Sequence, residues 1–111
     1  RRIALPAADF VKVAQLSEIP SGDMVPVKRD DDEILLANIA GEIFACDDIC
    51  SHSYASLCEG DIDGAEVQCP LHGAIFNVMT GEAITPPAVV ALRVFEVQID
   101  GDDILVGPTK T

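Results

Sequence analysis

Apolar and polar residues alternate in short segments along this chain, and residues that favour turns separate the segments. Valine, isoleucine and phenylalanine are frequent in these segments, which is typical of strands rather than helices. The pattern predicts strands at 10–14, 24–28, 34–39, 43–46, 66–69, 74–78 and 103–106. Pro26 cannot donate a backbone hydrogen bond, so we expect its strand at a sheet edge or a bulge.

The segment before the last turn alternates in two phases. Leu92 and Val94 follow one phase, and Phe95, Val97 and Ile99 follow the opposite one. Because successive side chains of a strand point to opposite faces, this slip predicts a β-bulge at 94–95 or burial of both faces.

Residues 47–87 differ from both flanking parts, since they are rich in Gly, Ser, Asp and Pro and contain only short strand-like pieces. A bound metal can supply the order that such irregular loops lack. We therefore expect a single all-β domain over 1–111. Its base is an antiparallel β-sandwich or barrel built from 1–46 and 88–111, with 47–87 inserted as a two-loop metal-binding subdomain.

Composition narrows the function classes. Of the 111 residues 49% are hydrophobic, which is typical of folded chains. No apolar run approaches the roughly 20 residues that span a bilayer, so we expect no membrane association. The net charge is −12, and no Lys or Arg occurs from Asp30 to Leu92. Such a surface repels nucleic acid and favours a basic protein partner.

The most informative residues form two short motifs, Cys50-Ser51-His52 and Cys69-Pro70-Leu71-His72, with sixteen residues between them. Each motif offers one thiolate and one imidazole. This is the ligand set of a structural zinc site or of a Rieske-type 2Fe–2S centre, in which two His replace two Cys on one iron. Metal ligation by cysteine, in place of disulfides, favours a reducing, cytoplasmic compartment.

The spacing Cys-x-His, sixteen residues, Cys-Pro-x-His-Gly resembles the Rieske motif, and Ala74-x-Phe76, Thr80-Gly81-Glu82 and Pro86-Pro87 resemble the segment that follows it. The resemblance implies one 2Fe–2S cluster, with Cys50 and Cys69 on one iron and His52 and His72 on the other. In respiratory members two further Cys form a disulfide, but this chain has Ala55 and Leu71 at those positions.

High-potential Rieske proteins also carry a Ser and a Tyr whose hydroxyls donate to cluster or ligand sulfur, and Ala74 and Phe76 stand there instead. The resemblance thus implies a low-potential, soluble ferredoxin of a bacterial aromatic-ring-hydroxylating dioxygenase system. Such a ferredoxin is an electron carrier and not an enzyme. It passes single electrons from an NAD(P)H-dependent flavoprotein reductase to a terminal oxygenase, which would dock against the acidic surface and the exposed His edges.

Three alternatives stay open at this point. One is a Rieske-like accessory subunit of another oxidoreductase, such as a nitrite reductase. The second is the soluble head of a respiratory Rieske protein, which the missing Cys pair disfavours, and the third is a structural zinc module. For the remaining residues, we expect Cys46 and Cys58 to be free thiols. Leu71 is a candidate docking residue, whereas Tyr54 and Leu57 fit either docking or packing beneath the loops.

Overall fold

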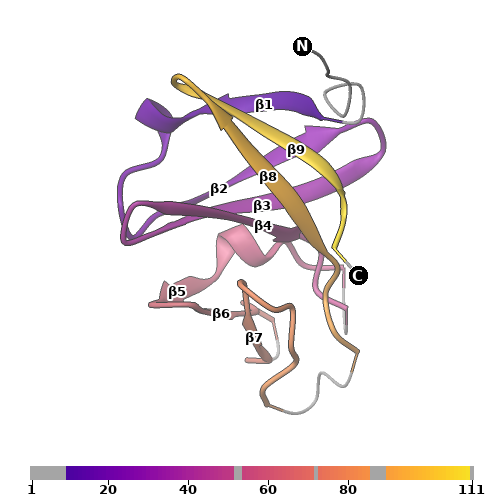
Figure 1. Ribbon diagram of the computed structural model, residues 1–111. Coiled ribbons are helices and arrows are strands. Elements are labelled where there is room, and N and C mark those ends of the chain that lie inside the picture. Colours follow the sequence, from indigo (N-terminus) through magenta and orange to yellow (C-terminus); the bar gives the residue numbers. More distant parts are fainter. Residues whose placement is uncertain (1–9, 52–53, 72, 86–89, 111) are drawn as a thin grey trace.

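The computed structural model describes residues 10–51, 54–71, 73–85 and 90–110. Six of the strands form one antiparallel sheet in the order β1-β9-β8-β4-β3-β2 (Figure 1). Their bounds are Val11–Gln15 for β1, Met24–Arg29 for β2, Asp32–Ile39 for β3, Glu42–Asp47 for β4, Val94–Asp100 for β8 and Asp103–Thr109 for β9. The end strands β1 and β2 contact each other, so the sheet is nearly closed. The predicted barrel-like, all-β architecture is confirmed.

A smaller antiparallel sheet lies below the first one in Figure 1. It contains β5 (Asp61–Asp63), β6 (Glu66–Gln68) and β7 (Ile75–Asn77), in that order. The described residues also include two short 3₁₀ helices, η2 at Leu16–Glu18 and η3 at Leu57–Glu59. Within the described ranges, no helix is long and apolar enough to cross a membrane.

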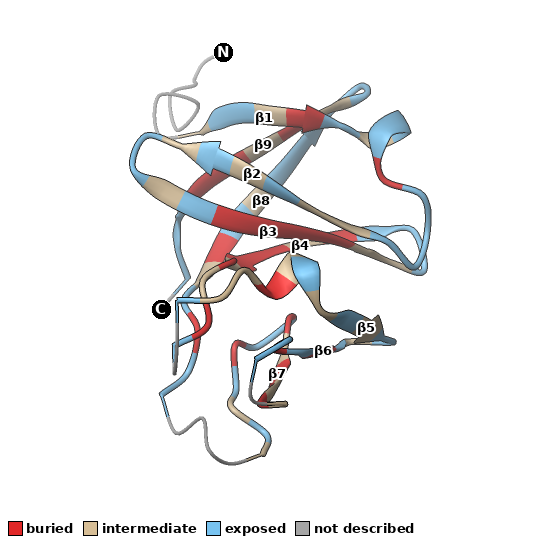
Figure 2. Ribbon diagram, turned by 180° about the vertical axis from the view of Figure 1, so that it is seen from behind, coloured by how far each residue is buried: buried red, intermediate tan, exposed pale blue. Residues whose placement is uncertain are grey.

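Strand β3 separates two hydrophobic cores. Its residues Ile34 and Leu36 pack inside the six-stranded sheet with Phe95 and Ile104. The alternate residues Leu35 and Ala37 pack on the other face, against the small sheet. All four β3 side chains have no exposed surface, and Figure 2 shows this strand buried along most of its middle. Burial on both faces explains why residues 34–37 read as a continuous apolar run instead of an alternating one.

The predicted strands are present, with ends shifted by at most three residues. Pro26 is exposed on β2, which lies at one end of the sheet order, as its missing N–H requires. The predicted slip in the last long segment appears as a register shift between Phe95 and Val97, slightly later than expected. The β3–β4 hairpin closes through Ala40 and Gly41, both with positive φ, as two-residue hairpin turns require.

Strand β5 was not predicted. Its sequence, Asp61-Ile62-Asp63, has two residues that disfavour strands. It forms because it pairs with β6 across a turn at Gly64, whose φ is 61°. Tertiary pairing here overrides local propensity.

Candidate metal centre

The segment between β4 and β8 leaves and re-enters the large sheet at adjacent points. Asp47 ends β4, and Arg93 immediately precedes β8. The backbone N–H of Asp47 donates to the Arg93 carbonyl at 3.0 Å, and the Arg93 N–H donates to the Asp47 carboxylate at 2.8 Å. The guanidinium adds further bonds to the same carboxylate and one to Asp32 at 3.1 Å.

Electrostatic interactions strengthen the link between Asp47 and Arg93. The hydrogen bond and charge of Arg93 hold the pKa of Asp32 below its usual value of 3.8. The hydrogen bonds that Asp47 accepts raise the pKa of Arg93, so the guanidinium stays charged. The two ends of the intervening segment are therefore pinned to each other and to β3.

The first motif begins in a tight antiparallel turn. Ile49 and Ser56 form an isolated β-bridge, and the Cys50 N–H donates to the Ala55 carbonyl at 2.9 Å. This pairing places the Cys50 side chain in the interior, with 2% of its surface exposed. His52 lies outside the described residues.

The second motif lies in the turn between β6 and β7. The Cys69 N–H donates to the Ala74 carbonyl at 2.7 Å, and the Gly73 N–H donates to the Cys69 carbonyl at 3.1 Å. Gly73 has a φ of 74°, a conformation that a residue with a side chain rarely adopts. Cys69 is 1% exposed. His72 lies outside the described residues, as do Pro86 and Pro87.

Both motif cysteines therefore enter one core. Cys50 and Cys69 belong to the same buried cluster as Leu57, Val67 and Phe76, and neither forms a disulfide. Two thiols that lie outside any disulfide and reach one buried core from two turns fit a group bound by thiolates, such as an iron–sulfur cluster. Among the described residues alone, no group of three or more His, Cys, Asp or Glu is placed to hold a metal ion.

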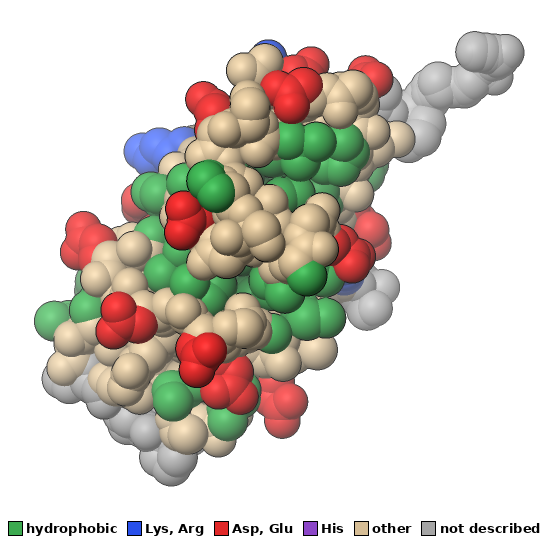
Figure 3. Space-filling model, turned by 90° about the vertical axis from the view of Figure 1, so that its left-hand side faces the viewer, with side chains coloured by type: hydrophobic (Ala, Val, Ile, Leu, Met, Phe, Trp, Pro, Cys, Tyr) green, Lys and Arg blue, Asp and Glu red, His purple; other side chains and the backbone are tan. Residues whose placement is uncertain are grey.

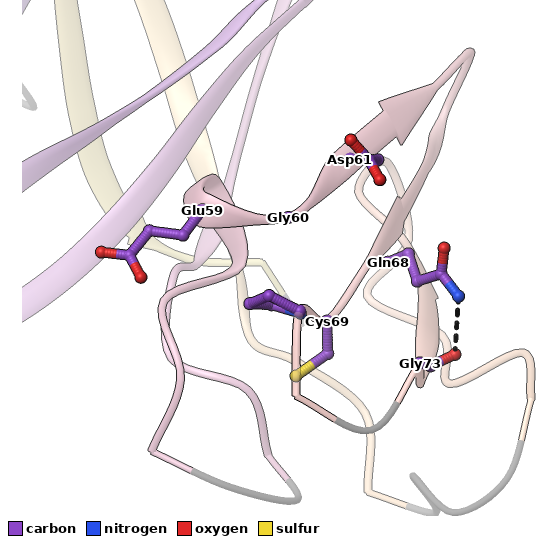
Figure 4. A pocket seen from close by; sticks show the side chains of 7 residues that line it. Glu59, Gly60, Asp61, Gln68, Cys69 and Gly73 are labelled. Atoms are coloured by element: carbon purple, nitrogen blue, oxygen red, sulfur yellow. Dashed lines mark hydrogen bonds between the residues drawn. The ribbon is translucent and has the colours of Figure 1, made fainter.

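A cleft of about 330 Å³ lies beside Cys69 (Figure 4). Its lining includes Glu59, Asp61, Gln68 and Gly73, and the Gln68 side chain donates to the Gly73 carbonyl at 3.4 Å. In Figure 4 the Glu59 and Asp61 side chains point in different directions, so they do not converge on a common ion. The cleft borders the second motif, and the acidic side chains that line it do not form a metal site of their own.

The exposed apolar side chains around the motifs differ in accessibility. Tyr54 is 97% exposed, Leu71 62% and Val90 60%. The Ser51 hydroxyl donates to the Val90 carbonyl at 2.6 Å, which ties the first motif to the segment before β8. Leu57, by contrast, has no exposed surface and packs in the core, so of its two predicted roles the structure supports packing.

The other two cysteines, Cys46 and Cys58, are free thiols as expected. Burial raises the pKa of both, and the negative charge of Asp48 raises it further. A thiol that resists ionisation is a poor nucleophile, so neither side chain has the character of a reactive cysteine.

Acidic side chains are spread over the surface. Figure 3 shows them scattered over the face that it presents, with few basic side chains among them. Three of the basic residues, Lys12, Arg29 and Arg93, form ion pairs within the chain. The motif-bearing part of the fold carries acidic side chains such as Glu59, Asp61 and Glu66.

The fold is a nearly closed antiparallel sheet with two cysteine-bearing turns beneath it. This arrangement is typical of a β-domain that binds an iron–sulfur cluster. The chain belongs to the Rieske family: residues 9–96 match the model described as "Rieske [2Fe-2S] domain". Its cofactor is one Rieske-type 2Fe–2S cluster.

Three relatives show how far the similarity extends. The chain is 36% identical, over 88% of its length and 94% of the relative's, to the ferredoxin component of naphthalene 1,2-dioxygenase/salicylate 5-hydroxylase systems from Ralstonia sp. It is 41% identical to the biphenyl 2,3-dioxygenase ferredoxin component of Rhodococcus jostii (strain RHA1), over 87% and 91% of the two chains. A chain in a structure of the complex of reduced oxygenase and oxidized ferredoxin in carbazole 1,9a-dioxygenase matches with a TM-score of 0.87, at 33% identity over 93% of this chain and 97% of that one.

Proposed function

We propose that this chain is the ferredoxin component of an aromatic-ring-hydroxylating dioxygenase system and carries single electrons to a terminal oxygenase. The observation that supports this most directly is similarity over nearly the whole length of chains that are themselves ferredoxin components. The chain is thus an electron-transfer component and not an enzyme. A structure of a ferredoxin bound to its oxygenase, to which this fold is similar, makes direct contact with the oxygenase the expected step.

The four motif residues are the proposed ligands. Cys50 and Cys69 would hold one iron from inside the shared core, and His52 and His72 would hold the other. The bound cluster supplies the site that gains and loses one electron. The chain's own contribution is to bury the thiolates, to fix both turns by backbone hydrogen bonds, and to pin the segment ends through Asp47 and Arg93.

We assign residues 47–87 as the cluster-binding insertion of a single domain that spans 1–111, with 1–46 and 88–111 as the base. The closure between Asp47 and Arg93 and the separate sheet β5-β6-β7 support this division. Electrons would reach this insertion from an NAD(P)H-dependent flavoprotein reductase in the cytoplasm. Docking would use the acidic surface and the edges of His52 and His72, with Leu71 contributing apolar contact.

The proposed carrier works at low potential. Ala74 and Phe76 are fully buried in the core that contains both cysteines, and neither has a hydroxyl to donate to sulfur. Without such donors the electron-rich reduced cluster is less stabilised. We expect a midpoint towards the lower end of the Rieske range of about −150 to +300 mV.

The alternatives considered from the sequence have less support. A structural zinc module does not agree with the family, whose cofactor is the 2Fe–2S cluster. An accessory subunit of another oxidoreductase, such as a nitrite reductase, would share this fold. The curated relatives described above are instead dioxygenase ferredoxins, which favours the dioxygenase system.

Reconstitution tests the proposal. The purified protein, NADH, a flavoprotein ferredoxin reductase and a terminal ring-hydroxylating oxygenase are combined, and hydroxylated product is measured with and without this chain. We expect product only when all components are present, and weaker turnover at high salt because exposed charges are screened. If reduction by the reductase proceeds but no ring-hydroxylating oxygenase accepts the electron, the assignment to this class of system is wrong.

A further inference from the structure

Asp48 is the one buried polar or charged residue among the described residues, with 1% of its surface exposed. No motif or spacing distinguishes it among the nineteen acidic residues of the chain. Its position is informative because it lies two residues before Cys50. Two residues of chain span at most about 7 Å between Cα atoms, so Asp48 is close to the proposed cluster.

The Asp48 carboxylate holds the loop that follows Cys50. Its Oδ2 accepts a hydrogen bond from the Ser56 hydroxyl at 2.5 Å, and its Oδ1 accepts one from the Cys58 N–H at 3.0 Å. The Asp48 backbone carbonyl accepts a further bond from the Leu57 N–H at 2.7 Å.

Both oxygens of this carboxyl group accept hydrogen bonds, Oδ1 from a backbone N–H and Oδ2 from a hydroxyl at 2.5 Å, a length typical of a bond to a charged oxygen. The ion pairs formed by the described residues all involve other carboxylates. The charge of Asp48 is therefore stabilised by neutral donors and is not cancelled by a cation from that part of the chain.

We infer that the buried Asp48 carboxylate lowers the reduction potential of the bound cluster, while its hydrogen bonds position the loop that carries Cys50. An electron added to the cluster is repelled by a fixed negative charge nearby, and low-dielectric surroundings strengthen that repulsion. The inference rests on the proposed ligation by Cys50 and Cys69. It adds a charge effect to the missing hydroxyls at Ala74 and Phe76.

The test is the midpoint potential of cluster-loaded variants, measured by spectroscopic titration at one fixed pH and salt concentration. Asp48→Asn keeps the shape and removes the charge, so its midpoint should rise. A unit charge at about 10 Å in an effective dielectric of about 20 changes the equilibrium constant for adding one electron about tenfold. That factor corresponds to about 59 mV for a one-electron couple.

Ser56→Ala separates charge from positioning. It removes one hydrogen-bond donor to Asp48 and so leaves the carboxylate charge less neutralised, and its midpoint should fall. Asp48→Asn and Ser56→Ala should both lower the thermal unfolding temperature. A purely structural role for Asp48 would not move the two midpoints in opposite directions. Glu96→Gln, an exposed change on β8, is the matched charge control and should leave the midpoint unchanged.

An Asp48→Asn midpoint at or below that of the wild type overturns the inference. If Asp48→Asn binds no cluster, the midpoint of Ser56→Ala tests the inference instead. A Ser56→Ala midpoint equal to or above the wild-type value also overturns the inference. The measurement requires no reductase or oxygenase, so its failure is distinct from failure of the proposed function. Iron and acid-labile sulfide content of the wild type tests the ligation separately.

Discussion

Asp47 and Arg93 are 46 positions apart in the chain, yet the guanidinium of Arg93 bonds both carboxylate oxygens of Asp47, at 2.8 to 3.1 Å. Arg93 also bonds Asp32 and lies over the Phe95 ring, with its guanidinium carbon 5.3 Å from the ring centroid. The Arg93 side chain thereby links the two ends of the proposed cluster-binding insertion.

Replacing Arg93 by Gln should lower the free energy of unfolding by about 1–2 kcal/mol, since it removes a partly exposed ion-pair network and a cation–π contact. The stability lost by Arg93→Gln should shrink as pH falls below 3.8. The pKa of Asp32 is lowered in the folded protein, so the stabilisation from its ion pair with Arg93 disappears as pH falls through that lowered pKa. Denaturant unfolding at several pH values measures both effects.

Lys12→Gln is the matched control for this prediction. It removes a single exposed ion pair with Asp103, 3.2 Å long, and should change stability by less than about 0.5 kcal/mol. Equal losses for the two variants would contradict the role given to Arg93.

The Ser51–Val90 hydrogen bond should slow loss of the cluster. Ser51→Ala removes the donor that links the first motif to the segment before β8. We expect faster bleaching of the visible absorbance in the presence of an iron chelator, and recovery in Ser51→Thr, which retains a hydroxyl. Equal bleaching rates for all three proteins would show that this bond does not protect the site.

Gly60 should tolerate no side chain. A Cβ at this position would lie 1.9 Å from the Gln68 carbonyl oxygen, directly before Cys69. Because that oxygen belongs to the backbone and cannot turn aside like a side chain, Gly60→Ala must displace β5 or β6, at a cost of about 1–3 kcal/mol.

Gly22→Ala is the control for the Gly60 prediction, since its Cβ would meet no atom within 4 Å but its φ of 90° is unfavourable for alanine. We expect a cost of about 1–2 kcal/mol from backbone strain alone, with unchanged iron content. Thermal unfolding and iron analysis distinguish the two variants, since only Gly60→Ala should also lower cluster occupancy.

Leu71 should contribute to oxygenase docking. Its side chain is 62% exposed within the second motif, so its loss affects contact with a partner more than the core. Leu71→Ala should reduce the rate of electron transfer to the oxygenase several-fold, with no change in midpoint. Ile99→Ala, which removes an exposed side chain from β8, should leave the rate unchanged.

The thiols of Cys46 and Cys58 should resist alkylation. Their folded pKa values are raised above 9.0, so they remain protonated and stabilise the fold below that pH. The unfolded chain ionises first, and stability should therefore fall as pH rises above about 9. Cys58→Ser should flatten this alkaline loss, and mass spectrometry after iodoacetamide treatment at pH 8 should find neither residue modified.

Much of the fold was predictable because hydrophobic alternation and turn residues act locally. The hairpin at Ala40-Gly41 and the edge position of Pro26 follow from backbone chemistry alone. Strand β5 was missed because its acidic residues disfavour a strand and only pairing with β6 stabilises it. The two-phase pattern before Phe95 indicated a bulge, although its place shifted by a residue or two.

The candidate site was predictable where the spacing of Cys and His residues along the chain indicates metal ligands. Cys50 and Cys69 were selected by their motifs, and the structure places both in one core. Asp48 was missed because burial depends on the fold, and the sequence shows only one more acidic residue beside Asp47. The roles of Ser51 and Arg93 were missed for the same reason, since each depends on a partner about forty residues away.

The double burial of β3 has a consequence for cooperativity. One core lies wholly within the large sheet, and the other contains both motif cysteines. Amide hydrogen exchange should therefore detect two units, with β5–β7 exchanging through local opening once the cluster is removed while β3, β4 and β8 stay protected. We therefore expect the large sheet to remain folded when the cluster is absent.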